Sequence, residues 1–263
     1  MNPISHMNEP GLIIFEDSHK LADYFVKQWI SLATQSIGTY GRFSCAFCGG
    51  RTPVEFYSLL SSADEFRLWS KVHIFLTDER FVDEHDKDNN FRLIKDNLLR
   101  HVSIPIENIH PIPTDVQTIG LAAEEYKNTL LRYFTLDKNH MPVFDLILLG
   151  LGEDGHTASL FPGTVGINDR YRLTIPVSNV SLKHDRISLT LSVINNARHV
   201  YFMITGRQKA QVVKEMIEDK KQYPAAQVSP ANGVLSYLLD AQAACLLQNQ
   251  EKNIFRGSPI PLN

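Results

Sequence analysis

The sequence predicts an α/β fold, built on a largely parallel open sheet with helices on both faces. Short apolar runs of strand length alternate with segments of helical periodicity along the whole chain. The run 144–149 is apolar almost throughout, as strands buried on both faces of a parallel sheet are. Glycines follow two of these runs within two residues, which is typical of the turn from a strand into a helix.

The first half of the chain contains three predicted strands, at 12–15, 43–47 and 72–76. Ser18 is expected to cap a helix, and Pro53 suits the first turn of a second one. The apolar positions of the first helix recur at helical spacing: Leu21, Ala22, Phe25, Trp29, Leu32 and Ala33. Further helices are expected at 90–99 and at about 118–134.

The second half of the chain continues the alternation. Strands are expected at 144–149, 172–177, 187–191, 200–204 and 234–239, and a helix at about 208–217. There is no internal repeat and no low-complexity linker, so residues 8–263 are predicted to form a single domain. Residues 1–7 are set aside as a tag remnant or a disordered amino terminus. We expect a Rossmann-like open sheet, with a small additional lobe that contains strands.

Composition excludes several classes of protein. The 263 residues are 43% hydrophobic and 21% charged, as in ordinary globular proteins. The net charge of -3 gives the chain no overall basic character for nucleic acid or anionic membrane, so an anionic small substrate would need a local cluster of cations. No apolar run approaches the length of a transmembrane helix, and no secretory signal is visible. Cys45 and Cys48 have C-x-x-C spacing, but no second cysteine pair exists for zinc. We therefore expect a cytoplasmic protein with reduced thiols, either a monomer or a weak homo-oligomer.

Segment 148–163 is the most informative part of the chain. Asp154, Gly155 and His156 follow a buried strand almost at once, at the strand end where open α/β sheets bind ligands. An isolated Asp-Gly-His would more often be a helix cap beside a solvated histidine. The unusual residues on both sides favour a catalytic role for Asp154 and His156.

Two further strand ends have residues suited to binding an anion or a sugar. After the strand at 43–47, Gly49 and Gly50 free backbone N–H groups for an anion, Arg51 adds charge and Thr52 a hydroxyl. Many turns between a strand and a helix look similar.

After the strand at 72–76, the segment 77–80 places two carboxylates beside an arginine. These carboxylates, Asp78 and Glu79, could with Arg80 orient a sugar hydroxyl or a water molecule. The alternative is a solvated turn with a local ion pair.

Two cations stand at the starts of later elements. Arg186 opens a strand and Lys209 lies in the first turn of a helix, where a phosphate would bind. Each could instead be ordinary surface charge.

Taken in order, these segments resemble the 6-phosphogluconolactonase family over nearly the whole chain. The motif 149–163 carries most of the resemblance. Related glucosamine-6-phosphate deaminases share Asp-Gly-His but usually continue with Ile-Ala-Phe-Asn-Glu-Pro, whereas this chain continues with Thr-Ala-Ser-Leu-Phe-Pro. Cys48 stands where the family usually has serine.

The resemblance implies hydrolysis of 6-phospho-D-glucono-1,5-lactone to 6-phospho-D-gluconate, in the oxidative pentose phosphate pathway. His156 would be the general base on water, since histidines titrate near neutrality, and Asp154 would orient the imidazole or the water. The lactone carbonyl is already electrophilic, so we expect no metal and no cofactor. The phosphosugar would be bound by Gly49, Gly50, Arg51, Thr52, Arg80, Arg186 and Lys209.

Two alternatives remain open. A glucosamine-6-phosphate deaminase would have an acidic residue just after Asp-Gly-His, and 160–163 contains none. A non-catalytic phosphosugar sensor would need a DNA-binding module, for which the single α/β body leaves no room.

Overall fold

A seven-stranded parallel sheet forms the centre of the molecule, as the alternation of strands and helices predicted. The computed structural model describes residues 10–136, 141–179 and 182–248. The strand order is β1-β10-β9-β6-β2-β3-β5, and every pairing is parallel. The strands are β1 Gly11–Phe15, β2 Phe43–Phe47, β3 Val72–Leu76, β5 Ile109–His110, β6 Leu146–Leu149, β9 His199–Ile204 and β10 Val234–Asp240.

A second, smaller sheet has three antiparallel strands in the order β4-β8-β7. These strands are β4 Asp78–Arg80, β8 Arg186–Leu189 and β7 Thr174–Val177. The sheet confirms the additional strand-containing lobe. It also shows that segment 77–80 is not a solvated turn, because Asp78 and Glu79 are buried and pair with β8.

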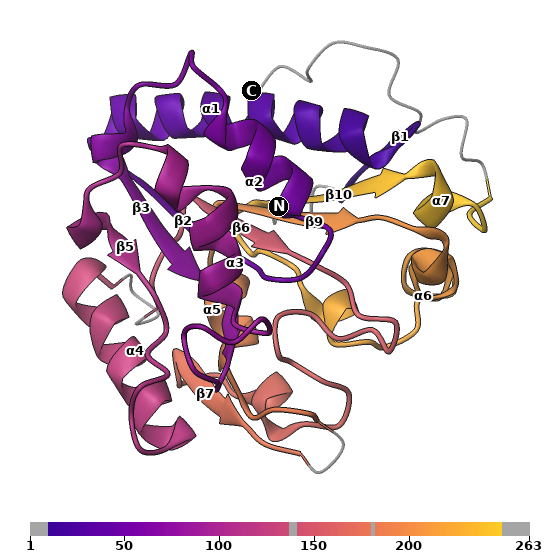
Figure 1. Ribbon diagram of the computed structural model, residues 1–263. Helices are drawn as coiled ribbons and strands as arrows, with labels where there is room; N and C mark the ends of the chain where they lie inside the picture. Colours follow the sequence, from indigo (N-terminus) through magenta and orange to yellow (C-terminus); the bar gives the residue numbers. More distant parts are fainter. Residues whose placement is uncertain (1–9, 137–140, 180–181, 249–263) are drawn as a thin grey trace, which may run out of the picture.

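Helices cover both faces of the central sheet. Figure 1 shows α1 and α2 on one side, and α4 with the strand β7 of the small sheet on the other. The helices are α1 Ser18–Tyr40, α2 Val54–Ser61, α3 Asn90–Asn97, α4 Ile119–Tyr133, α5 Leu191–Ile194, α6 Ala210–Ile217 and α7 Ala241–Ala244.

Several predicted boundaries are shifted by capping side chains. The cap of α1 is Asp17, whose carboxylate accepts a hydrogen bond from the Lys20 amide at 2.8 Å, so Ser18 is the first helical residue. The strand predicted at 187–191 is β8, which begins one residue earlier and ends at Leu189, because Thr190 caps α5. Lys209 lies in a short 3₁₀ turn directly before α6.

The core lies between the sheet and its helices. Trp29 of α1 is fully buried and packs edge-on against Phe43 of β2 and Phe66, at centroid distances of 5.4 and 5.1 Å. Within the described ranges no helix is long and apolar enough to cross a membrane. The expectation for residues 1–7 falls outside the described residues, and the single-domain assignment stays a prediction.

Candidate functional site

Several of the candidate residues come together at one edge of the central sheet. Because its strands are parallel, their carboxyl ends meet at that edge. Direct contacts join the loops that follow different strands: the Thr205 hydroxyl, after β9, lies 3.2 Å from the Thr52 hydroxyl, after β2. The Ser159 hydroxyl, after β6, donates to Asp78 at 2.7 Å.

The turn after β6 holds Asp154 and His156 in contact. The Nδ1 atom of His156 lies 2.5 Å from Oδ1 of Asp154. A Cβ at Gly152 would come within 2.1 Å of that Nδ1, so only glycine fits there. Phe161 packs against the imidazole at a centroid distance of 4.4 Å, and the side chain of His156 remains 32% exposed. With Nδ1 donating to the carboxylate, Nε2 is the nitrogen that can accept a proton.

The Asp154 carboxyl is held in its ionised form. Burial acts to raise its pKa, but the charge of His156 and the hydrogen bonds from His156 outweigh burial, and the pKa is lowered. An ionised Asp154 stabilises the imidazolium that forms when His156 takes up a proton. This is the electrostatic arrangement that a histidine base needs.

Asp78 is buried beneath the same turn. One of its carboxylate oxygens accepts the Ser159 hydroxyl, and the other lies 3.1 Å from the Thr77 hydroxyl. Ser159 belongs to the motif 149–163, but the sequence alone did not predict its contact with Asp78. The contact fixes β4 relative to the loop of His156.

Glu79 points to the opposite side of β4 from Asp78, as neighbouring strand residues do. Its carboxylate is fully buried and accepts three backbone N–H groups, those of Arg80 and Asn90 at 2.7 Å and that of Phe91 at 2.8 Å. Burial raises the pKa of Glu79 to about 7, although these hydrogen bonds act to lower it. The residue anchors the start of α3.

Asn90 joins the glycine loop to β4. The side-chain Nδ2 of Asn90 donates to the backbone carbonyl of Asp78 at 3.0 Å. A Cβ at Gly49 would lie 1.8 Å from the Oδ1 of Asn90. Gly50 next to it has φ +91°, which favours glycine. The buried Oδ1 of Asn90 and Nε of Arg80 have no hydrogen-bond partner within the described ranges.

The predicted cations form two groups. In the first, Lys209 Nζ lies 4.0 Å from a Glu153 carboxylate oxygen. Burial lowers the Lys209 pKa; the carboxylates of Glu153 and Asp154 oppose this, and the charge of Arg51 adds to it. Lys209 and Arg51 therefore act on each other next to the turn of His156.

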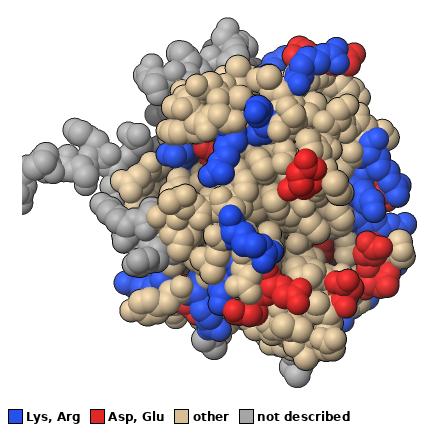
Figure 2. All heavy atoms as spheres, turned by 90° about the vertical axis from the view of Figure 1, so that its left-hand side faces the viewer, with Lys and Arg blue, Asp and Glu red and all other residues tan. Residues whose placement is uncertain are grey.

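The second group is Arg80 and Arg186, which stand directly opposite each other on β4 and β8. Burial lowers the Arg186 pKa, and the charge of Arg80 lowers it further. The nearby carboxylates of Asp78, Glu79 and Asp88 act against this lowering. Like charges in opposite positions cost stability unless anions lie near them. The pair is therefore suited to a negatively charged group. Both signs of charge occur on the face shown in Figure 2, in keeping with a net charge of only -3.

Comparison with known proteins identifies the family. Residues 16–237 match the family described as glucosamine-6-phosphate isomerases/6-phosphogluconolactonase. The chain belongs to that family. It is 41% identical over 213 residues to the 6-phosphogluconolactonase of Synechocystis sp., across 80% of this chain and 87% of that protein. It also matches the human GDH/6PGL endoplasmic bifunctional protein, at 36% identity over 217 residues, but spans only 27% of that protein's length.

Solved structures of the family share this fold. The 6-phosphogluconolactonase from Trypanosoma brucei matches with a TM-score of 0.83 and 27% identity, over 91% of this chain and 99% of that one. A monomeric glucosamine-6-phosphate deaminase matches with a TM-score of 0.76 and 16% identity, over 90% of this chain and 100% of that one, which shows the fold alone.

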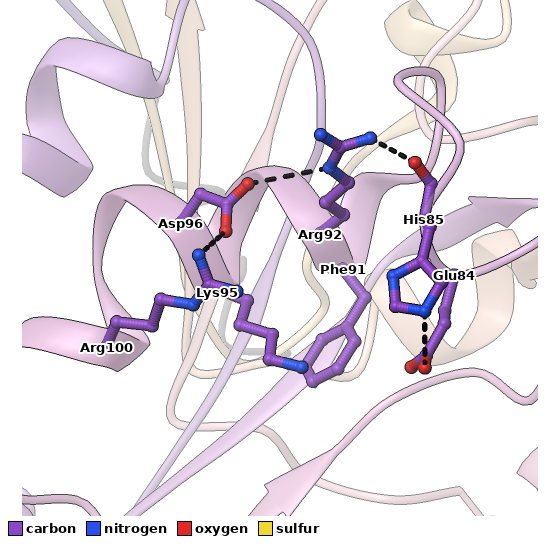
Figure 3. A pocket seen from close by; sticks show the side chains of 7 residues that line it. All are labelled: Glu84, His85, Phe91, Arg92, Lys95, Asp96 and Arg100. Atoms are coloured by element: carbon purple, nitrogen blue, oxygen red, sulfur yellow. Dashed lines mark hydrogen bonds and ion pairs between the residues drawn. The ribbon is translucent and has the colours of Figure 1, made fainter.

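A surface depression beside α3 is separate from the predicted family site (Figure 3). Its charges are largely paired, since Arg92 and Arg100 both contact Asp96, at 3.6 and 2.6 Å. Lys95 lies over the Phe91 ring at 5.9 Å. None of the candidate site residues lines this depression.

The two cysteines with C-x-x-C spacing offer no reactive thiol to the site. Cys45 and Cys48 are free and buried. Burial raises the pKa of the Cys48 thiol to about 12, and the nearby Asp78 adds to the effect. Across the described ranges, no three His, Cys, Asp or Glu side chains are grouped so as to hold a metal ion. That this protein is active without a metal ion stays a prediction.

Proposed function

We propose that the chain is a 6-phosphogluconolactonase, which hydrolyses 6-phospho-D-glucono-1,5-lactone to 6-phospho-D-gluconate. The 2.5 Å contact between His156 Nδ1 and Asp154, next to cations at the end of a parallel sheet, carries the proposal. The names of its relatives in Synechocystis sp. and Nostoc sp., at 41% and 36% identity, support the substrate.

In this mechanism His156 is the general base. Nε2 takes a proton from water while the water oxygen bonds to the lactone carbonyl carbon. Asp154 stabilises the imidazolium across its contact with Nδ1. The same proton then passes to the ring oxygen as the bond between that oxygen and the carbonyl carbon breaks, which opens the ring and leaves a carboxylic acid that ionises.

The cations bind the charged groups of the substrate. We place the 6-phosphate with Lys209, Arg186 and the N–H groups of the Gly49–Gly50 loop, because charge-assisted hydrogen bonds to a dianion are strong. Arg51, Thr52 and Arg80 complete the binding set. Asp78, held by Ser159, would orient the sugar or the attacking water.

A coupled assay with freshly prepared phosphogluconolactone tests the proposal. After subtraction of spontaneous hydrolysis, His156→Ala should lose roughly 10²–10⁴-fold in kcat, the usual contribution of a general base. His85→Ala is the control, because that side chain is 82% exposed and lies elsewhere. Near wild-type turnover by a folded His156→Ala protein would contradict the role of His156. Ammonia release from glucosamine 6-phosphate without lactone hydrolysis would instead identify a deaminase.

A further inference from the structure

We propose that Tyr223 is a positioning residue for His156: its ring holds the turn 154–156 in the geometry that brings the imidazole onto Asp154. The kinetic part of this inference rests on the proposed function. Tyr223 does not touch the reacting atoms and acts through Gly155.

Tyr223 and Ala225 both contact Gly155, one through its side chain and the other through its backbone. Gly155 has φ +81°, and a Cβ there would lie 2.1 Å from Cδ1 of Tyr223. The ring therefore packs directly on the Gly155 Cα. The amide of Ala225 donates to the Gly155 carbonyl at 3.1 Å. Both the side chain and the backbone of segment 223–225 thus restrain the residue between Asp154 and His156.

The ring of Tyr223 is itself fixed to α6. Its hydroxyl hydrogen-bonds to the carboxylate of Glu215. That carboxylate also accepts from Gln211 at 2.8 Å and from Lys221 at 3.1 Å, and the Lys221 ammonium lies 4.8 Å from the centre of the Tyr223 ring. These contacts lower the pKa of Glu215 to about 2, first through the Tyr223 hydroxyl. The anchor is therefore ionised across the neutral pH range.

Helix α6 is consequently linked to the turn of His156 at two points. Lys209, directly before the helix, faces Glu153, and Glu215, near its end, holds Tyr223 against Gly155. The same helix therefore positions a phosphate-binding cation and the base. A shift of about 1 Å at a reacting group can cost roughly 100-fold in rate, so loss of the ring should act on turnover.

The decisive measurement is the ¹⁵N spectrum of His156 in the unliganded protein. In the wild type, Nδ1 should show the shift of a protonated nitrogen that donates to Asp154. In Tyr223→Ala, the Nδ1 and Nε2 shifts should move toward the values of a free mixture of tautomers. Tyr171→Ala, which removes a tyrosine that is 91% exposed, should leave them unchanged.

Kinetics provide the second readout. Tyr223→Ala should lower kcat about 10–100-fold, the loss expected from misplacement of a catalytic group. KM for the phosphorylated lactone should change less than about threefold, because uniform binding is untouched. Tyr223→Phe keeps the ring on Gly155 and should retain most of kcat, whereas Tyr223→Leu should fall between the two.

Wild-type His156 signals in a folded Tyr223→Ala protein would overturn the inference, as would a loss carried by KM alone. If Tyr223→Ala does not fold, the same criteria apply to Tyr223→Leu, which keeps an apolar side chain beside Gly155. Absence of lactone hydrolysis in the wild type would contradict the proposed function only, because the ¹⁵N spectra are recorded without substrate.

Discussion

Arg186 is the residue at which the proposed contact with the substrate phosphate can be tested. It opens β8 opposite Arg80, and its Nε donates to the His184 carbonyl at 3.3 Å. The neighbouring Nη1 of Arg80 is occupied by the Asp88 carbonyl at 2.6 Å. Backbone carbonyls thus orient both guanidinium groups. The remaining N–H groups of Arg186 are suited to an anionic group of the substrate.

Arg186→Ala should therefore lower kcat/KM for the phosphorylated lactone by about 10–100-fold, since a charge-assisted hydrogen bond is worth roughly 1.5–3 kcal/mol. The same substitution should change kcat/KM little for unphosphorylated gluconolactone, which lacks the phosphate. Steady-state assays on both lactones measure the difference. Equal fractional losses would mean that Arg186 serves the reacting end or the fold instead.

Glu79 should make stability depend on pH in the opposite sense to most carboxyl groups. Its pKa rises from 4.5 to about 7 on folding, mainly through burial. The folded state then holds the extra proton, so the contribution to stability is present below pH 4.5 and is lost as pH rises through 7. Glu79→Gln cannot ionise, so its stability relative to wild type should increase over this window.

Urea unfolding at several pH values between 4 and 8 measures this effect. Glu84→Gln is the matched control, because that carboxyl is 60% exposed on the following loop. A constant difference in unfolding free energy between Glu79→Gln and wild type across the window would refute the prediction.

At the scale of elements, parallel strand ends made the location of several candidate residues predictable. Apolar runs located β2, β3, β6 and β9, and residues just beyond each run had to lie at one edge of the sheet. The structure brings the predicted Thr52 to Thr205, and Lys209 to the turn of His156. Contacts between loops could not be predicted from the sequence. The pairings of Ser159 with Asp78 and of Tyr223 with Gly155 join residues that no local pattern relates.

Among the elements that sequence patterns missed, β4 bears most directly on the candidate site. It is three residues long and all three are charged, Asp78, Glu79 and Arg80, so it shows no apolar alternation. The strand forms because β8 supplies its partner and because buried N–H groups satisfy Glu79. Strand β5, with only two residues, offered no readable pattern either.

The glycine loop after β2 offers a test of how closely the elements fit. In Gly49→Ala, the new methyl group would meet Oδ1 of Asn90, so kcat/KM should fall. Adding Asn90→Ala to that variant makes room and should restore part of the loss, with a coupling of roughly 0.5–3 kcal/mol. Gly38→Ala is the control, since nothing lies near a Cβ at that position. Strictly additive losses in this double-mutant cycle would contradict the predicted contact.

For the whole molecule, two histidines on neighbouring strands should contribute to the loss of stability in acid. His73 of β3 and His110 of β5 stack with their rings 5.6 Å apart. Burial lowers the pKa of each from 6.5 to about 4; the charge of Arg42 adds to the effect on His73, and that of His73 to the effect on His110. As pH falls, these two histidines therefore bind protons at a higher pH in the unfolded chain than in the folded protein. The stability that they contribute above pH 6.5 should be lost as pH falls toward 4.

Replacing both side chains, in His73→Gln/His110→Gln, should flatten the fall of the melting temperature between pH 6.5 and 4. Glu79 opposes the histidines in part of this window, so its own variant is measured in parallel. His101→Gln, which alters an exposed histidine, is the control. A double variant with the wild-type slope would show that other groups dominate acid unfolding.

The order of the strands also affects how the chain can fold as it is synthesised. Strand β1 forms an edge of the sheet only by pairing with β10, where Gly11 lies opposite Ser236. On the ribosome, at roughly 5–20 residues per second, β1 must wait for tens of seconds before its partner emerges. During that time β2 and β3 can already pair with each other, while the apolar side chains of Ile13 and Ile14 have no sheet to join. A nascent chain stalled before β10 should therefore expose β1 to proteases and chaperones, and release of the last strand should protect it.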